Sequence, residues 1–270
     1  MNPVHHKDMG RPFRQCALCR TDGLLCSSHL IPAAAMKKLR APGSSNPNPI
    51  FVTDDEAYTS SRQLQRHLLC ENCEARFRTQ GETWVLQNGF QGDYSFPLRE
   101  ILLKSSPTRV MSDGLRLYPA AGLSGIDLSQ LIYFGLSVFW RAGVCEWRRR
   151  NDRIRVDLGP YLEPLRLFLN GDAAFPENMA YGVRVSSQTN ILAIAHLPES
   201  WQLGGSRLHT FGLPGLTFYL VVGKRFPIGY VKTSTAPAPE GYIGIHPKRD
   251  EEELMAMVNR VRRTRDRTGQ

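Results

Sequence analysis

Four of the six cysteines in the chain form two pairs with C-x-x-C spacing. Cys16 and Cys19 are the first pair, and Cys70 and Cys73 are the second. A C-x-x-C turn lets two thiolates bind one cation, and a structural zinc ion takes four nitrogen or sulfur ligands in a tetrahedron. The two pairs supply four sulfur ligands. We therefore predict that Cys16, Cys19, Cys70 and Cys73 bind a structural zinc ion.

The two pairs lie about fifty residues apart, and much of the intervening chain is a loop rich in proline, serine and asparagine at residues 40–49. A longer loop adds little closure entropy, so the separation does not exclude a shared ion. A thiol redox pair is an alternative interpretation, although it leaves the second pair unexplained, and core cysteines without a ligand are another. Cys26 and Cys145 stand alone and are expected to be buried thiols.

A histidine and a glutamate extend the cysteine pattern. Between the pairs the chain reads Ser-His-Leu-Ile-Pro, with His29 in second place, and Glu74 directly follows the second pair. Over about residues 16–82 this pattern resembles the HNH superfamily of nucleases, the ββα-metal group of treble-clef proteins. The resemblance implies a metal-dependent endonuclease that hydrolyses DNA phosphodiesters. It places His29 as general base and Glu74 as a ligand of a catalytic Mg²⁺ or Mn²⁺ ion, roles that suit a neutral imidazole and a carboxylate.

The motif is altered at two positions relative to that family. Ser28 stands where the family usually has an acidic or histidine metal ligand. The asparagine that orients the base has no clear match, and Gln65 is the nearest candidate. His67, Glu71 and Glu82 are further side chains of the right chemistry for a missing ligand.

The two proposed catalytic residues also have structural interpretations. His29 is either the general base, a hydrogen-bonding group that holds the turn beside the cysteines, or a zinc ligand in place of one cysteine. Glu74 is either a metal ligand or a solvated glutamate favoured by the dipole at a helix start. A second hypothesis for the function is therefore a non-catalytic zinc-finger protein that binds nucleic acid or a protein partner.

The chain is basic, with 34 Lys and Arg against 25 Asp and Glu and a net charge of +9. A basic surface suits the phosphate backbone of DNA, the partner that the resemblance implies. Of the basic residues that flank the cysteine pairs, those expected to contact nucleic acid are Lys37, Lys38, Arg66 and Arg76. Residues 148–150 are all arginine and form a second candidate cluster with Arg153 and Arg155. Solvated helix faces are the alternative interpretation for both groups.

The apolar periodicity predicts an α+β fold in four segments. These are a flexible arm at 1–15, a zinc-binding module at 16–104, which the resemblance implies is of ββα-metal (treble-clef) type, a helical region at 105–180, and an antiparallel β region with a C-terminal helix at 181–270. Asp127 is expected to cap a long helix that ends in the arginines at 148–150, and a second helix is expected at 160–169. The expected C-terminal strands lie at 181–187, 190–197, 216–231 and 241–247, and the C-terminal helix at 250–263.

Composition excludes other classes of protein. Hydrophobic residues make up 41% and charged residues 22% of the chain, which is typical of a globular protein. The longest apolar run, 131–140, has about half the length of a membrane span. The polar N-terminus lacks the apolar segment of a signal peptide, so a cytoplasmic protein is expected. A protein partner or a second copy of the chain is expected to bind, if at all, through the C-terminal β region.

Overall fold

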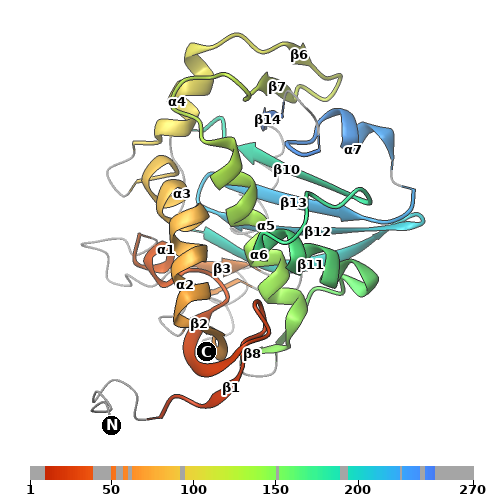
Figure 1. Ribbon diagram of the computed structural model, residues 1–270. Helices are drawn as coiled ribbons and strands as arrows, with labels where there is room; N and C mark the ends of the chain where they lie inside the picture. The colour runs from red at the N-terminus through yellow and green to blue at the C-terminus, as the bar shows by residue number, and fades with distance from the viewer. Residues whose placement is uncertain are drawn as a thin grey trace, which may run out of the picture.

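The computed structural model describes residues 10–38, 50–52, 57–59, 63–91, 95–149, 152–188, 194–225, 227–237 and 241–246. It has a mixed α+β fold, as the sequence predicts. Figure 1 shows helices α1, α2, α3 and α5 packed beside and in front of a large sheet that contains strands β10–β13. None of the described helices has the length and apolar character that crossing a lipid bilayer requires.

A small antiparallel sheet carries the two cysteine pairs. Its strand order is β1-β2-β5, with β1 at Phe13–Gln15, β2 at Asp22–His29 and β5 at Gln65–Cys70. Helix α2, Glu71–Phe77, begins directly after β5. Strands β2 and β5 are therefore neighbours although residues 30–64 lie between them in the chain.

A nine-stranded mixed sheet forms the main layer of the fold (Figure 1). Its strands follow the order β4-β3-β11-β12-β13-β10-β14-β7-β6. Neighbouring strands are antiparallel except β3 with β11 and β10 with β14, which are parallel. In chain order the bounds are Ile50–Val52 (β3), Ala57–Thr59 (β4), Arg109–Val110 (β6), Arg116–Pro119 (β7), Met179–Val185 (β10), Ile194–Leu203 (β11), Ser206–Leu213 (β12), Leu216–Val222 (β13) and Tyr242–Ile245 (β14).

The apolar helix α5, Leu128–Val144, packs on the main sheet and on helix α2. Asp127 accepts a hydrogen bond from the amide of Gln130 and caps the helix start, as the sequence predicts. On the main sheet, the ring of Phe139 lies 5.0 Å from that of Phe211. The remaining helical segments are α1 (Ala33–Lys38), η2 (Arg78–Glu82), α3 (Thr83–Asn88), α4 (Pro97–Lys104), η3 (Gly159–Tyr161), α6 (Leu162–Asn170) and α7 (Ile228–Lys232).

The π-helical turn η2 packs closely against α5. A Cβ atom on Gly81 would lie only 2.8 Å from the main-chain nitrogen of Phe134, so glycine is needed at this crossing. The close approach lets Glu82, the last residue of η2, form an ion pair with Arg141 of α5. Single π turns inside helices are frequent at functional sites.

The structure differs from the sequence prediction at four places. Residues 13–15, expected in a flexible arm, form β1 because they pair with residues 22–24. Helix α5 ends at Val144, before the arginines at 148–150, since Cys145 is extended and Trp147–Arg149 forms strand β8, paired with β9 at Asp152–Ile154. Residues 228–232, expected in a strand, form helix α7 after Pro227.

The fourth difference concerns the extent of the main sheet. Its strands come from residues 50–59, 109–119 and 179–245, so all three segments expected as separate regions contribute to it. The C-terminal region is antiparallel at β11-β12-β13-β10, as predicted, but β12 at Ser206–Leu213 was not among the expected strands, and the region acquires parallel neighbours at β3 and β14. The expected helix at 250–263 lies outside the described residues.

His209 is a fully buried ionisable group of the main sheet. Its Nδ1 lies 2.8 Å from Oγ of Ser200, and its Nε2 is buried without a hydrogen-bond partner among the described residues. Burial, with a smaller effect of the Arg207 charge, lowers the pKa of His209 to about 4. The imidazole is therefore neutral in the folded protein at pH values where it takes up a proton in the unfolded chain.

This difference predicts a loss of stability in mild acid. Between about pH 7.5 and pH 5 the unfolded chain gains a proton at His209 that the folded chain does not, which lowers the free energy of unfolding by about 2 kcal/mol. Urea unfolding across this range measures the effect. A His209→Gln variant should lose this part of the acid dependence, and a His67→Gln variant, altered on the exposed surface of β5, should keep it. An unchanged dependence in His209→Gln would show that other groups cause the effect.

Candidate metal centre and the adjoining cleft

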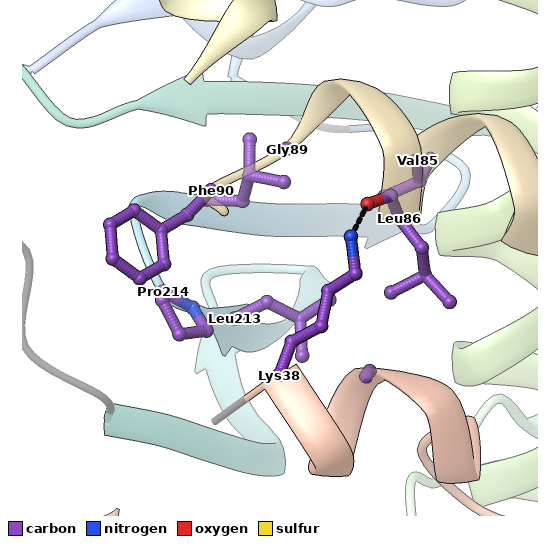
Figure 2. Close-up of a pocket in the computed structure, with 9 residues that line it drawn as sticks. Lys38, Val85, Leu86, Gly89, Phe90, Leu213 and Pro214 are labelled. Carbon is purple, nitrogen blue, oxygen red and sulfur yellow. Dashed lines mark hydrogen bonds between the residues drawn. The ribbon is translucent and has the colours of Figure 1, made fainter. Parts of the chain in front are cut away.

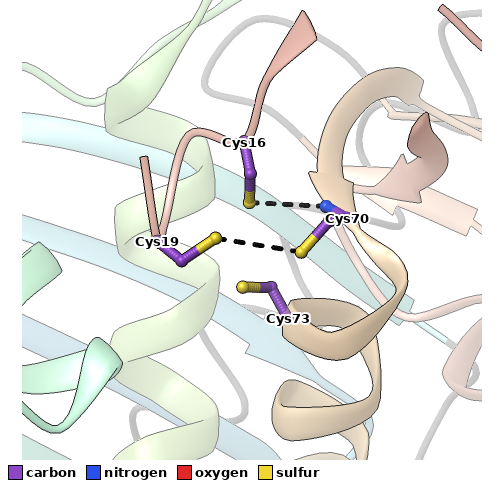
Figure 3. Close-up of side chains that lie close together, drawn as sticks. All are labelled: Cys16, Cys19, Cys70 and Cys73. Carbon is purple, nitrogen blue, oxygen red and sulfur yellow. Dashed lines mark hydrogen bonds between the residues drawn. The ribbon is translucent and has the colours of Figure 1, made fainter. Parts of the chain in front are cut away.

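The four cysteines of the two C-x-x-C pairs lie together. Their sulfur atoms are all within 4.8 Å of one another, and Sγ of Cys19 is 3.9 Å from Sγ of Cys70. Figure 3 shows the four side chains pointing toward a common centre. Zinc–sulfur bonds of about 2.3 Å in a tetrahedron place sulfur atoms about 3.8 Å apart, so the cluster fits a zinc ion.

Two different local structures supply the sulfur ligands. The first pair lies in the turn between β1 and β2, closed by a hydrogen bond from the amide of Arg20 to the carbonyl oxygen of Cys16. Arg20 adopts a φ of 64°, in the left-handed region that a tight turn requires here. In the second pair, Cys70 ends β5 and Cys73 lies in the first turn of α2.

The cluster stabilises a negative charge on sulfur. A hydrogen bond with the Cys73 thiol has the largest effect on Cys16 and, together with main-chain amides including that of Cys70, lowers the pKa of Cys16 to about 4 against the effect of burial. The same hydrogen bond, with burial, raises the pKa of Cys73. One thiolate is therefore favoured, but four thiolates at these distances need a cation to balance their charge.

The two single cysteines lie outside the cluster. Both are half-buried, and burial raises the pKa of each thiol. The sulfur of Cys26 accepts a hydrogen bond of 3.2 Å from the guanidinium of Arg11. These two residues are natural controls for the four clustered cysteines.

A cleft of about 430 Å³ adjoins the cluster and contains both residues proposed for catalysis, His29 and Glu74. Its walls come from the end of β2, from α1, from the continuous helical segment α2-η2-α3, and from α5. The lining residues are His29, Pro32, Ala33, Ala34, Lys38, Glu74, Arg78, Glu82, Thr83, Leu86, Gln87 and Arg141.

Gln65 positions the imidazole of His29. The two residues face each other across β2 and β5, and Nε2 of Gln65 is 2.8 Å from Nε2 of His29. Ser27 donates a hydrogen bond of 3.2 Å to Oε1 of Gln65, which steadies the amide. Burial has the largest effect on the pKa of His29 and lowers it, and the positive charge of Arg141 lowers it further. His29 is therefore neutral at physiological pH.

One carboxylate oxygen of Glu74 lacks a hydrogen-bond donor among the described residues. This atom, Oε1, is buried. A buried carboxylate oxygen without a donor is costly, so this position is suited to a cation. The neighbouring Cys73 belongs to the sulfur cluster, which ties the position of Glu74 to that of the cluster.

Arg141 is a cleft residue that the sequence analysis did not identify. It is 1% exposed, pairs with Glu82, and lies 4.7 Å from the ring centroid of Phe77. Its Nε is buried without a hydrogen-bond partner among the described residues. The signal in the sequence was a single charged residue in the apolar run of α5.

Ser28 faces away from this set of groups. It is 1% exposed, does not line the cleft, and its hydroxyl accepts a hydrogen bond of 3.2 Å from the amide of Leu69. This bond lies beside the β-bulge at Cys26 and Ser27, where β2 and β5 shift register. Ser28 therefore supports the strand pairing.

The four basic residues expected at a nucleic-acid interface have different environments. Lys37 and Arg66 are exposed. Lys38 donates to the carbonyl oxygen of Leu86 beside a small apolar pocket (Figure 2), so it joins α1 to α3. Arg76 donates to the carbonyl oxygen of Asn170 at the end of α6.

A scan against protein-family models found no family that matches this chain, and searches of curated proteins and of solved structures likewise found no match. The interpretation of the cluster and the cleft therefore depends on their chemistry and geometry.

The cluster predicts one tightly bound zinc ion per chain. A Cys73→Ser variant should lose the ion and more than about 3 kcal/mol of unfolding free energy, because metal binding contributes directly to the stability of such sites. Metal analysis and urea unfolding measure the two effects. Cys26→Ser and Cys145→Ser should keep the zinc. A zinc-free wild-type protein, or full zinc in Cys73→Ser, would contradict the prediction.

Replacing Glu74 or Glu82 by glutamine should change the free energy of unfolding in opposite directions. Without divalent ions, Glu74→Gln should raise the free energy of unfolding by about 1 kcal/mol, because it removes a buried charge that lacks a partner. Glu82→Gln should lower it by about 3 kcal/mol, because Arg141 loses its carboxylate in a buried pair. Urea unfolding with a weak chelator that leaves the zinc in place measures both. Equal destabilisation would show that Glu74 has a structural partner.

Proposed function

We propose that this protein is a metal-dependent endonuclease of HNH type that hydrolyses DNA phosphodiesters, with a structural zinc ion at Cys16, Cys19, Cys70 and Cys73. The order of β2, β5 and α2 supports a ββα-metal, treble-clef module, because two antiparallel strands lead directly into a helix. One cysteine pair precedes the first strand, and the other lies where the second strand meets the helix.

One observation carries the proposal: His29 and Glu74 line the same cleft, 45 positions apart in the sequence. A base and a carboxylate that meet in a cleft are the minimum set for metal-assisted hydrolysis of a phosphodiester. Ser28, which differs from the family motif, points away from this pair, and its hydroxyl accepts a hydrogen bond from the main-chain amide of Leu69 in β5.

Each group on the cleft wall has a role in this proposal. His29 accepts a proton from the attacking water at Nδ1, with the Gln65 amide turned so that its oxygen accepts Nε2–H of the imidazole and holds the ring in position. Arg78 and Arg141 place positive charge near the phosphate oxygens. Arg141 is held by its pair with Glu82, so its position is set before substrate binds.

The carboxylates of the cleft fit a divalent ion such as Mg²⁺ or Mn²⁺. Glu74 has the unpartnered oxygen that such an ion needs, and Glu82 is the candidate for the second ligand that Ser28 does not supply. A bound ion would polarise the phosphate and stabilise the leaving oxygen.

The second candidate function is a non-catalytic zinc-finger protein that binds nucleic acid or a protein partner. The buried, main-chain-bonded Ser28 favours it, because the family position of a metal ligand is here used for strand pairing. In this alternative, His29 and Gln65 only stabilise the end of the β2-β5 ribbon.

Cleavage of plasmid DNA separates the two functions. The wild-type protein should nick DNA with Mg²⁺ or Mn²⁺, and His29→Ala should lower the rate by about 100-fold or more, the usual contribution of a general base. His67→Ala, on the same strand as Gln65, should keep the activity. Because burial lowers the pKa of His29, the cleavage rate of the wild type should stay constant as the pH falls to below 6.5. DNA binding without cleavage would favour the zinc-finger function.

A further inference from the structure

The β8-β9 hairpin has two contrasting faces. Trp147 and Ile154 oppose each other and are buried, and so is Val156, which follows β9. Trp147 donates a hydrogen bond of 2.8 Å from Nε1 to the carbonyl oxygen of Arg141. The amide of Val156 donates to the carbonyl oxygen of Ala142. The inner face therefore holds the hairpin firmly on the end of α5.

The outer face of the same hairpin carries arginine side chains. Arg148 and Arg153 oppose each other across the strands, and their side chains are 64% and 71% exposed. Arg155 continues the alternation and is also exposed. Like charges directly opposite each other on a ribbon cost stability, so this face is better suited to an anion than to water alone.

Arg66 of β5 is exposed and lies near this surface. The hydrogen bond from Arg148 lowers the pKa of Glu146 and the charge of Arg66 lowers it further, and the same charge opposes the burial that raises the pKa of Cys145. We call the exposed set Arg66, Arg148, Arg153 and Arg155 the arginine face. Glu146 is the carboxylate that contacts it among the described residues, through pairs with Arg148 and Arg153.

The arginine face is linked to the cleft by two short connections. On β5, Arg66 is adjacent to Gln65 and pairs with Ser28, so its side chain is on the opposite face of the strand from Gln65 and His29. On α5, the carbonyl group that receives the Trp147 hydrogen bond belongs to Arg141, whose side chain lines the cleft. The arginine face and the cleft are therefore carried by the same two elements, β5 and the end of α5.

We propose that the arginine face is the surface that binds the phosphate backbone of duplex DNA. The charge of the face supports this, because four guanidinium groups suit a repeating anion. Its shape supports it too, because a two-stranded β ribbon fits the major groove of a duplex. The inference deepens the proposed function but does not need cleavage to occur. Its contacts are with phosphates, so they position the duplex without reading its sequence.

Salt-dependent binding of a short labelled duplex tests the inference. An Arg148→Gln, Arg153→Gln double variant should bind about tenfold more weakly, and its slope of log affinity against log salt should be smaller by about 2 between about 50 and 200 mM KCl. The matched control is Arg225→Gln, Lys232→Gln, which removes the same charge from exposed residues beside α7. It should bind as the wild type does.

In the binding experiment, three outcomes would overturn the inference: no duplex binding by the wild type, equal weakening in both double variants, or stronger binding of single-stranded RNA than of duplex DNA. The His29→Ala variant separates the inference from the proposed function. If the wild type and His29→Ala both bind through the arginine face and neither cleaves DNA, the inference stands and the endonuclease proposal fails. If the wild type cleaves and the Arg148→Gln, Arg153→Gln variant cleaves equally well, the inference fails.

Discussion

The convergence of four sulfur atoms determines the local structure on which the rest of the site depends. Cys16 and Cys19 belong to a turn between strands, whereas Cys70 and Cys73 belong to a strand end and a helix start. Sulfur atoms within 4.8 Å of one another hold these two places together. This cluster fixes the position of the β5–α2 corner relative to the turn between β1 and β2. It therefore also fixes the position of Glu74 relative to the end of β2. A cation in this cluster would also balance charge that thiolates alone cannot share.

A second interaction, the buried pair of Arg141 and Glu82, links the helical segment that follows the small sheet to helix α5. Arg141 comes from the central helix α5, and Glu82 from the π-helical turn that crosses it at Gly81. The pair lies in the floor of the cleft, so the packing of the two layers also sets the charge near His29. The packing of η2 on α5 and the charge at the site therefore depend on the same contact. A buried ion pair of this kind contributes little net stability and mainly fixes geometry.

Features encoded in a few adjacent residues were predictable from the sequence. The C-x-x-C pairs, the Asp127 cap and the helix expected at 160–169 are all local signals, and the structure shows the cysteine cluster, the capped start of α5 and helix α6. Contacts between distant segments were not predictable. No local pattern indicates that β3 pairs in parallel with β11, or that Arg141 meets Glu82. Strands of two or three residues are too short to show a period of two, so β6, β8 and β9 were missed.

The central claim is that the sulfur cluster and the cleft are two separate metal sites, one structural and one catalytic. Anomalous diffraction from crystals of the zinc-bound protein soaked in Mn²⁺ tests it most directly. The account predicts a zinc peak among the four sulfur atoms and a manganese peak in the cleft in contact with Glu74. A zinc peak alone, or manganese bound away from Glu74 and His29, would contradict it.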